Sequence, residues 1–137
     1  MRIMVDSNII ISAALFPNSI VGSVFTHIIK NHKLVICEYT LGEIESVFKR
    51  KFPDRIKYLR IFIKKLKYEL VKFKITDFNK YPKIRDINDT PILGYGIESK
   101  VNILLTGDKD FEEICIENFK IMNPRKYIEK YMGNNIK

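Results

Sequence analysis

The stretch VNILLTGDKDF, residues 101–111, leads a run of apolar side chains into a glycine and then into two aspartates. The run Val101–Thr106 is apolar at nearly every position, as strands that are buried on both faces of a sheet tend to be. Asp108 and Asp110 come directly after it, at the start of a segment, residues 108–117, that we predict to be helical. The stretch therefore predicts a buried strand that brings two carboxylates to one edge of a sheet.

Three more apolar runs predict strands, namely Ile3–Val5, Lys33–Cys37 and, as an edge strand, Phe119–Met122. Helical periodicity fills the segments between them, at residues 7–15, 22–31, 40–51, 54–68 and 90–100, and the stretch NPRKYIEKY predicts a short last helix. Strands that alternate with helices indicate an α/β fold with a largely parallel sheet. We therefore predict a single domain over residues 1–137, a length that allows a proper core, with residues 133–137 as a disordered tail.

The composition indicates a basic protein. Lys and Arg number 24 against 16 Asp and Glu, which gives a net charge of +8 and favours polyanionic partners such as nucleic acid. No apolar run approaches the roughly 18 residues that a membrane span needs, and no leader precedes the first predicted strand. Cys37 and Cys115 lie far apart in apolar surroundings, which argues against a disulfide framework or a zinc site. We expect a cytoplasmic protein without membrane contact, with both thiols reduced in the core.

Four predicted helix starts carry a carboxylate. Asp6 follows the first strand, Asp108 follows the strand of residues 101–106, and Glu43 lies in the first turn of the helix after KLVIC. Asp89, in RDINDTPIL, comes just before a helix start. Because functional groups of parallel α/β sheets gather outside the carboxyl ends of the strands, we expect at least three of these acids at one edge.

Each of these acids has an alternative role as a helix cap. Asp6, Asp89 and Asp108 suit N-cap positions, as does Ser7, and Thr40 with Glu43 matches the capping-box pattern. Helix caps can also be Ser, Thr or Asn, so positions that served only as caps would not all need to be acidic. The carboxylates at the four predicted helix starts, taken together, therefore favour a shared site.

Converging carboxylates repel one another unless a cation lies between them. A set of oxygen ligands suits Mg²⁺ or Mn²⁺ rather than zinc, because no His or Cys belongs to it. His27 and His32 lie on or beside the second predicted helix, where we expect them on the surface.

The segments DSNII, NDTPIL and TGDKDF, with a glutamate in the helix after the second strand, resemble the PIN-domain nucleases over residues 1–125. The resemblance is strongest to the branch described as toxin components of bacterial and archaeal toxin–antitoxin systems. It implies a three-layer α/β/α sandwich with a central, mainly parallel twisted sheet, PIN-like and Rossmann-like, and one or two Mg²⁺ or Mn²⁺ ions. The implied catalytic and metal-binding acids are Asp6, Glu43, Asp89 and Asp108, with Asp110 as a further metal ligand and Ser7, Asn8 and Thr106 in support. Asp89 matches the family position because Ile92 follows it by three residues, which leaves Asp86 as a helper.

The resemblance implies an endoribonuclease that hydrolyses RNA phosphodiester bonds with the help of these ions. It further implies an antitoxin that inserts a segment near the site, and a homodimer; a solitary nuclease is the alternative. Two other readings stay open, a nucleic-acid-binding module without catalysis and a phosphatase with an aspartyl nucleophile. Asn8 weakens the phosphatase reading, because that chemistry uses an acid two residues after the nucleophile.

The segment from Phe48 to Lys74 is the most basic part of the chain. A narrow apolar stripe suited to packing recurs at helical spacing, at Ile56, Leu59, Ile63, Leu66 and Leu70. The predicted cationic strip follows one residue later and comprises Lys57, Arg60, Lys64 and Lys67. The strip is either a solvated helix face or a surface that tracks RNA phosphates, and we name it as the candidate RNA contact.

Overall fold

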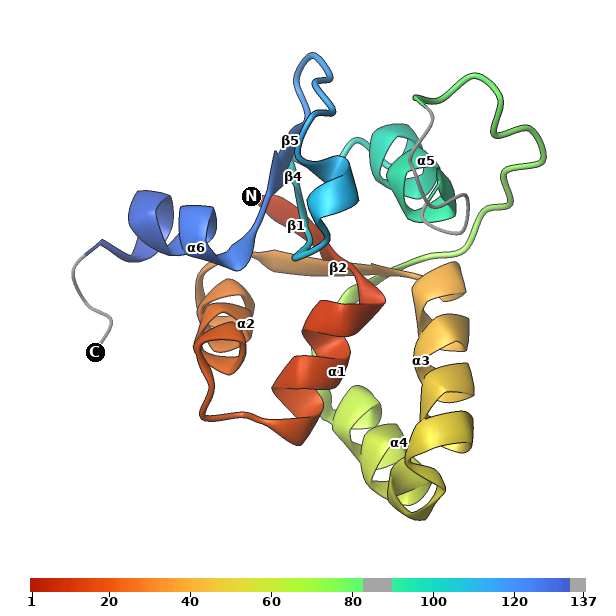
Figure 1. Ribbon diagram of the computed structural model, residues 1–137, viewed down its shortest axis with the longest axis vertical. Helices are drawn as coiled ribbons and strands as arrows, with labels where there is room; N and C mark the ends of the chain where they lie inside the picture. The colour runs from red at the N-terminus through yellow and green to blue at the C-terminus, as the bar shows by residue number, and fades with distance from the viewer. Residues whose placement is uncertain (83–89, 134–137) are drawn as a thin grey trace.

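The computed structural model describes residues 1–82 and 90–133, and over these residues the chain forms one five-stranded sheet. The strands are β1 (Arg2–Val5), β2 (Lys33–Cys37), β3 (Glu69–Val71), β4 (Ile103–Leu105) and β5 (Lys120–Met122). Their order is β3-β2-β1-β4-β5, and every neighbouring pair is parallel. β1 therefore lies at the centre of the sheet, hydrogen bonded on both sides (Figure 1).

Helices cover both faces of the sheet, which confirms the predicted α/β sandwich. The helices of one face are α1 (Ser7–Leu15), α2 (Ile20–Asn31), α3 (Glu38–Lys51), α4 (Ile56–Lys65) and α6 (Pro124–Tyr127). The other face carries α5 (Thr90–Glu98) and the chain around Phe111 and Phe119. A 3-10 turn, Pro53–Arg55, precedes α4, and a turn of π-helix, Ile128–Met132, follows α6.

The strands are apolar at almost every position because both of their faces are buried. In β1, Ile3 and Val5 belong to the core under α1 and α2, whereas Met4 belongs to the core under α5. All three are 0% exposed. The alternation of side chains along a strand thus divides one apolar run between two cores.

β3 is a strand that the sequence prediction missed. We expected a helix over residues 54–68, but α4 ends at Lys65 and the chain then turns into Glu69–Val71. Helical spacing extends from Leu66 to Leu70 only by coincidence. β3 is short and lies at the sheet edge, where charged residues are common, so it lacks the apolar run by which strands are recognised.

The helix predicted over residues 108–117 does not form. A 3-10 turn, Lys109–Phe111, is followed by an antiparallel bridge between Ile116 and Phe119. Asn118 closes that bridge with a φ of 60°, a left-handed conformation that Asn tolerates better than most residues. The alternation of exposed residues with half-buried, β-branched Ile114 and Ile116 explains the difference, because such residues favour extended chain.

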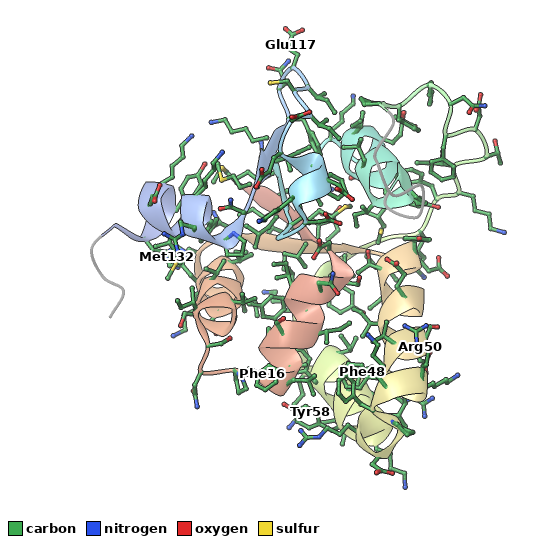
Figure 2. All side chains as sticks on the ribbon, viewed as in Figure 1. Phe16, Phe48, Arg50, Tyr58, Glu117 and Met132 are labelled. Carbon is green, nitrogen blue, oxygen red and sulfur yellow. The ribbon has the colours of Figure 1, made fainter. Side chains whose placement is uncertain are left out.

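The apolar stripe of α4 packs as predicted along most of its length. Leu59 is buried, while Ile56 and Ile63 are half-buried against the core beneath α1 and α3. Tyr58 reaches α1, where its hydroxyl donates a hydrogen bond of 2.7 Å to the carbonyl of Ala14. Figure 2 shows Tyr58 and Phe16 at the end of α1 remote from the sheet. This corner ties α4 to α1.

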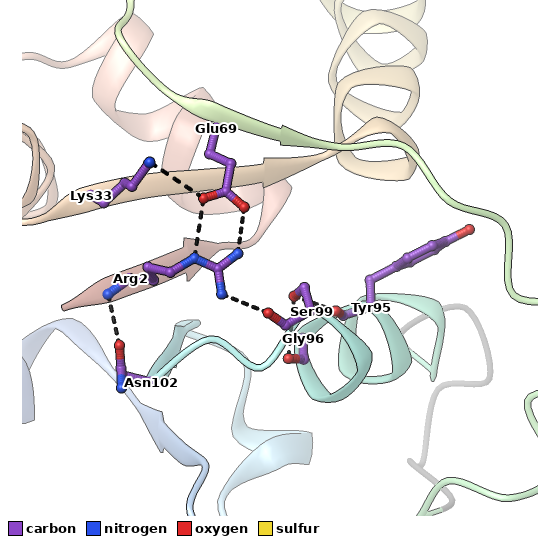
Figure 3. Close-up of polar contacts among 7 residues, drawn as sticks. All are labelled: Arg2, Lys33, Glu69, Tyr95, Gly96, Ser99 and Asn102. Carbon is purple, nitrogen blue, oxygen red and sulfur yellow. Dashed lines mark hydrogen bonds and ion pairs between the residues drawn. The ribbon is translucent and has the colours of Figure 1, made fainter.

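At the amino edge of the sheet, where the strands begin, Arg2 of β1 contacts Glu69 of β3 and Ser99 (Figure 3). Arg2 Nη2 pairs with Glu69 Oε2, its Nε donates to Glu69 Oε1 at 3.1 Å, and its Nη1 donates to the carbonyl of Ser99 at 2.6 Å. Lys33 lies 3.7 Å from the same carboxylate. The short β3 is therefore fastened to β1 and β2 by side chains as well as by backbone hydrogen bonds.

Within the described residues, no single helix is long and apolar enough to cross a membrane. One bent pair, α1 with α2, meets the criteria of length and composition together, at an angle of 106°. Both helices bury residues in the core beneath the sheet.

Candidate active site

Asp6 lies at the carboxyl end of the central strand and is 9% exposed. Its Oδ1 accepts a hydrogen bond of 3.1 Å from the backbone N–H of Ile9, so Asp6 is the N-cap of α1, as the capping interpretation predicted. Its Oδ2 accepts a hydrogen bond from the hydroxyl of Thr106. One carboxylate is thus held by a helix start and by the end of the neighbouring strand.

A chain of hydrogen bonds continues from Asp6 to the second aspartate. Thr106 is 2% exposed, and its Oγ1 accepts a hydrogen bond of 3.1 Å from the backbone N–H of Asp108. The Oδ1 of Asp108 accepts in turn from the N–H of Asp110 at 2.9 Å. The stretch Thr106–Asp110 is folded into a compact turn, which fixes Asp108 relative to Asp6.

The pKa of the Asp6 carboxyl is raised above its ordinary value of 3.8, chiefly because the group is buried. The hydrogen bonds from Thr106, Ile9 and the N–H of Asn8 lower the pKa in part, and the negative charge of Asp108 raises it. The two carboxylates are therefore close enough to repel each other.

Glu43 lies on α3, the helix that follows β2, and is half-buried. α3 begins at Glu38, two residues before its predicted start, so Glu43 falls in the second turn and the predicted capping box of Thr40 with Glu43 is wrong. The hydroxyl of Thr40 is instead 3.1 Å from Cys37 Sγ. Burial raises the pKa of Cys37, and the charge of Glu43 adds to that rise. Glu43 is thus within electrostatic reach of the carboxyl end of β2.

The remaining predicted residues are divided between the site and the undescribed part of the chain. Ser7 is the half-buried first residue of α1, and Asn8, which follows it, is exposed. Asp86 and Asp89 lie outside the described residues. The described part of the predicted set that comes together is thus Asp6, Thr106, Asp108 and Asp110, with Glu43 nearby.

In the described part of the chain, no group of three His, Cys, Asp or Glu side chains is close enough to hold a metal ion. The donors that do converge fit a hard divalent cation nonetheless. Asp6 and Asp108 offer carboxylate oxygens, the ligands that Mg²⁺ and Mn²⁺ prefer, and their mutual repulsion would be offset by positive charge. Asp6 and Asp108 are therefore the described residues that would hold such an ion.

Three of the four residues of the predicted cationic strip lie on α4, and all four are exposed. Arg60 is paired with Glu45 of α3, with its Nη2 2.7 Å from Oε1. Lys67 lies beyond the end of α4 and lines a cavity at the amino edge of the sheet, with Arg2 among its neighbours. Of the predicted strip, Lys57 and Lys64 are exposed lysines on α4, and neither takes part in an ion pair within the described residues.

Two predictions about buried and exposed groups are wrong. His27 and His32 are half-buried rather than on the surface, because they pack against the last helices, and His27 Nδ1 lies 2.7 Å from the hydroxyl of Tyr127. Cys37 is buried as predicted, but Cys115 is exposed in the turn where a helix was expected.

Sequence reasoning missed the residues on the β5 side of the site. A shallow hollow beside Asp108 is lined by Thr106, Asn123 and Lys126, among others. Asn123 follows β5 and caps α6 through its side chain, which accepts from the N–H of Lys126 at 2.8 Å. The sequence contained a signal for Asn123, because this polar residue comes directly after a predicted strand, as Asp6 does after β1.

Comparison with known proteins places the chain in a family. The sequence profile of the PIN domain matches residues 2–110. An uncharacterized protein of Methanocaldococcus jannaschii is 30% identical over 145 residues, which cover 95% of this chain and 91% of the relative. The crystal structure of VapBC2 from Rickettsia felis bound to a DNA fragment from their promoter is similar in fold, with a TM-score of 0.67 at 24% identity over 90% of this chain and 98% of that chain. Because the profile match extends over most of the sequence, this chain belongs to the PIN-domain family.

Proposed function

We propose that the chain is a metal-dependent endoribonuclease that hydrolyses RNA phosphodiester bonds. The observation that carries the proposal is the carboxylate of Asp6, which is buried at a strand end, fixed by Ile9 and Thr106, and repelled by Asp108. Burial and the like charge of Asp108 both oppose ionisation of this carboxyl, and its hydrogen bonds offset that opposition only in part. The arrangement suits a site that is completed by a cation.

The proposed acids are Asp6, Glu43, Asp89 and Asp108, with Asp110 as a further ligand and Ser7, Asn8 and Thr106 in support. Mg²⁺ or Mn²⁺ held by these carboxylates would lower the pKa of water for attack on phosphorus and offset the charge of the phosphodiester. The chain itself supplies position. Thr106 and the N–H of Ile9 fix both oxygens of Asp6, and the N–H of Asp110 fixes Asp108.

The biological role that we propose is the toxin of a toxin–antitoxin pair, in the cytoplasm, with a protein antitoxin as partner. Membership of the PIN-domain family and the similarity in fold to VapBC2 support it. A homodimer belongs to the same proposal. Ile20 and Ile61, which are more than half exposed, offer apolar surface for such contacts.

The test is cleavage of a pool of single-stranded and hairpin RNAs with Mg²⁺, with Mn²⁺ and with EDTA. Asp6→Asn and Asp108→Asn should abolish metal-dependent cleavage, and Asp89→Asn and Glu43→Gln should do the same if those acids complete the site. Asp54→Asn is the matched control, because Asp54 is exposed at the corner between α3 and α4.

Retention of cleavage in Asp6→Asn would contradict the proposal. RNA binding without cleavage under every metal would favour the non-catalytic module. Turnover of a phosphomonoester that is lost in Asp6→Asn would favour the aspartyl phosphatase.

A further inference from the structure

A cluster of aromatic rings lies at the carboxyl end of β3, outside the acid site. Its centre is Tyr95 of α5, whose ring centroid is 5.6 Å from that of Phe73 and 6.3 Å from that of Phe78. The ring of Tyr39, at the start of α3, is stacked on Tyr95 at 6.4 Å and 25°. Phe73 thus packs on Tyr95, and Tyr95 is in turn packed between Tyr39 and Phe78.

Phe73 is nevertheless 44% exposed, although Val71, two residues earlier, is 5% exposed. Lys72 and Lys74 flank it, and both are exposed. Within residues 1–82 and 90–133, neither lysine takes part in an ion pair. A fixed aromatic ring between two unpaired cations is the combination by which proteins bind single-stranded nucleic acid, because cations attract the phosphates and the ring stacks on a base.

The position of Phe73 relative to the acid site follows from the strand register. Val71 pairs with Cys37 across β3 and β2, and the β1–β2 register, continued by two residues from the pair Met4 and Val35, sets Cys37 opposite Asp6. Neighbouring strands are about 4.8 Å apart, so about 10 Å separates the end of β3 from that of β1. The segment that carries Phe73 leaves the sheet beside the start of α3 and passes around α5 (Figure 1). A short stretch of single strand spans the distance from Asp6 to the ring.

We infer that Phe73, with Lys72 and Lys74, is a base-stacking subsite for single-stranded RNA beside the acid cluster. The substrate in this inference rests on the proposed ribonuclease function. The subsite accepts any base, because every base has an aromatic face, and it does not accept duplex RNA, whose bases are already stacked on each other. It adds two exposed cations, Lys72 and Lys74, to those of the strip on α4.

The experiment measures binding of a short fluorescent single-stranded RNA by anisotropy in EDTA, so that the probe stays intact. Phe73→Ala should weaken binding about tenfold, a loss within the range that stacking on an aromatic side chain contributes per base. Phe73→Trp should bind at least as tightly as the unchanged protein. Phe16→Ala is the matched control, because Phe16 is 63% exposed at the far end of α1, and its binding should be unchanged.

A second probe separates stacking from charge. On an oligonucleotide of the same length made of abasic sites, Phe73→Ala and the unchanged protein should bind equally, because only phosphates remain. Lys72→Ala should weaken binding to both probes and reduce the slope of log affinity against log salt by about 0.7. A Phe73→Ala loss of equal size on both probes, or no loss on the intact probe, would overturn the subsite.

The outcomes also distinguish the subsite from the proposed function. Binding that depends on Phe73 without any cleavage would overturn the ribonuclease and leave the subsite, whereas cleavage with binding indifferent to Phe73 would overturn the subsite alone. Thermal unfolding by circular dichroism checks that Phe73→Ala is folded. If that variant unfolds, Phe73→Leu provides the test, because it keeps an apolar side chain in the cluster without an aromatic face and should bind as weakly.

Discussion

The hydroxyl of Thr106 donates a hydrogen bond to Oδ2 of Asp6, and its oxygen accepts one from the N–H of Asp108. One buried side chain thus sets the separation of two acids that are 102 residues apart in the sequence. Thr106→Val keeps the shape and removes both hydrogen bonds. We expect RNA cleavage to fall about 10- to 100-fold, as when partners of metal ligands are lost, and the free energy of unfolding to fall by about 1–3 kcal/mol.

Thr106→Ser should restore most of both losses, because it returns the hydroxyl without the methyl group. The pH profile gives a readout that packing alone would not move. Since the bond from Thr106 lowers the pKa of Asp6, its loss should shift the acid limb of the cleavage profile to higher pH. An unshifted profile in Thr106→Val would contradict the positioning role.

Asp6 should make the metal-free protein less stable as pH rises. Its pKa is raised in the folded state, so between the unfolded value, about 4, and the folded value the native protein binds more protons than the unfolded chain. The free energy of unfolding therefore falls as pH increases through this window. Asp6→Asn removes that dependence. Urea titrations in EDTA from pH 4 to pH 8 should therefore show the free energy of unfolding of the variant rising relative to that of the unchanged protein as pH increases. If the difference in the free energy of unfolding between the two proteins does not change with pH, folding does not raise the pKa of Asp6.

Two glycines in helices should respond in opposite directions to alanine. A Cβ at Gly22, near the start of α2, would lie 2.3 Å from the carbonyl oxygen of Pro17, whereas a Cβ at Gly42 of α3 meets nothing within 4 Å. Gly42→Ala should stabilise the fold by about 0.5–1 kcal/mol through helix propensity. Gly22→Ala gains the same propensity but forces backbone apart, at a cost of about 1–3 kcal/mol, so a net loss is expected. Thermal unfolding of the two variants measures both, and equal melting temperatures would contradict the close turn between α1 and α2.

The pair of Arg2 and Glu69 should stabilise the protein more than the exposed pair of Arg60 and Glu45. The hydrogen bonds from Arg2 lower the pKa of Glu69, although partial burial opposes them. The pair therefore stabilises the protein fully above the pKa that Glu69 has in the unfolded chain. This stabilisation is lost as pH falls through the lower pKa that Glu69 has in the folded protein. Glu69→Gln should cost about 1 kcal/mol at pH 7 and progressively less below pH 4, as measured by urea unfolding. Glu45→Gln serves as the control, for which we expect no measurable loss.

The carboxyl edge of the sheet could be predicted because each central strand is a continuous apolar run that ends in a polar residue. Asp6 and Asp108 are identified by that transition alone, and parallel pairing then brings them to the same edge. The start of α3 was less predictable, because the contact between Cys37 and Thr40 depends on where the chain bends after β2. Glu43 is consequently placed one turn farther along its helix than expected.

The failures concern segments that are fixed by distant partners. β3 pairs with β2, more than 30 residues earlier, and Glu69 contacts Arg2, 67 residues away; the local sequence of β3 indicates neither partner. The helix expected over residues 108–117 is replaced by a turn and a bridge around Asn118. The prediction started this helix at Asp108, a possible N-cap, and did not use the alternation of Ile114 and Ile116 with polar or charged neighbours.

The strand order has a consequence for folding during synthesis. Ile3 pairs with Leu34, 31 residues ahead, and with Ile103, 100 residues ahead. During synthesis the first strand acquires one neighbour early, while its other side waits until three-quarters of the polypeptide has been made. A growing chain therefore exposes the unpaired edge of β1, which is prone to aggregation until β4 has been synthesised. Asp6 and Asp108 meet only at that late moment, so an unfinished polypeptide lacks the paired acids on which the proposed activity depends.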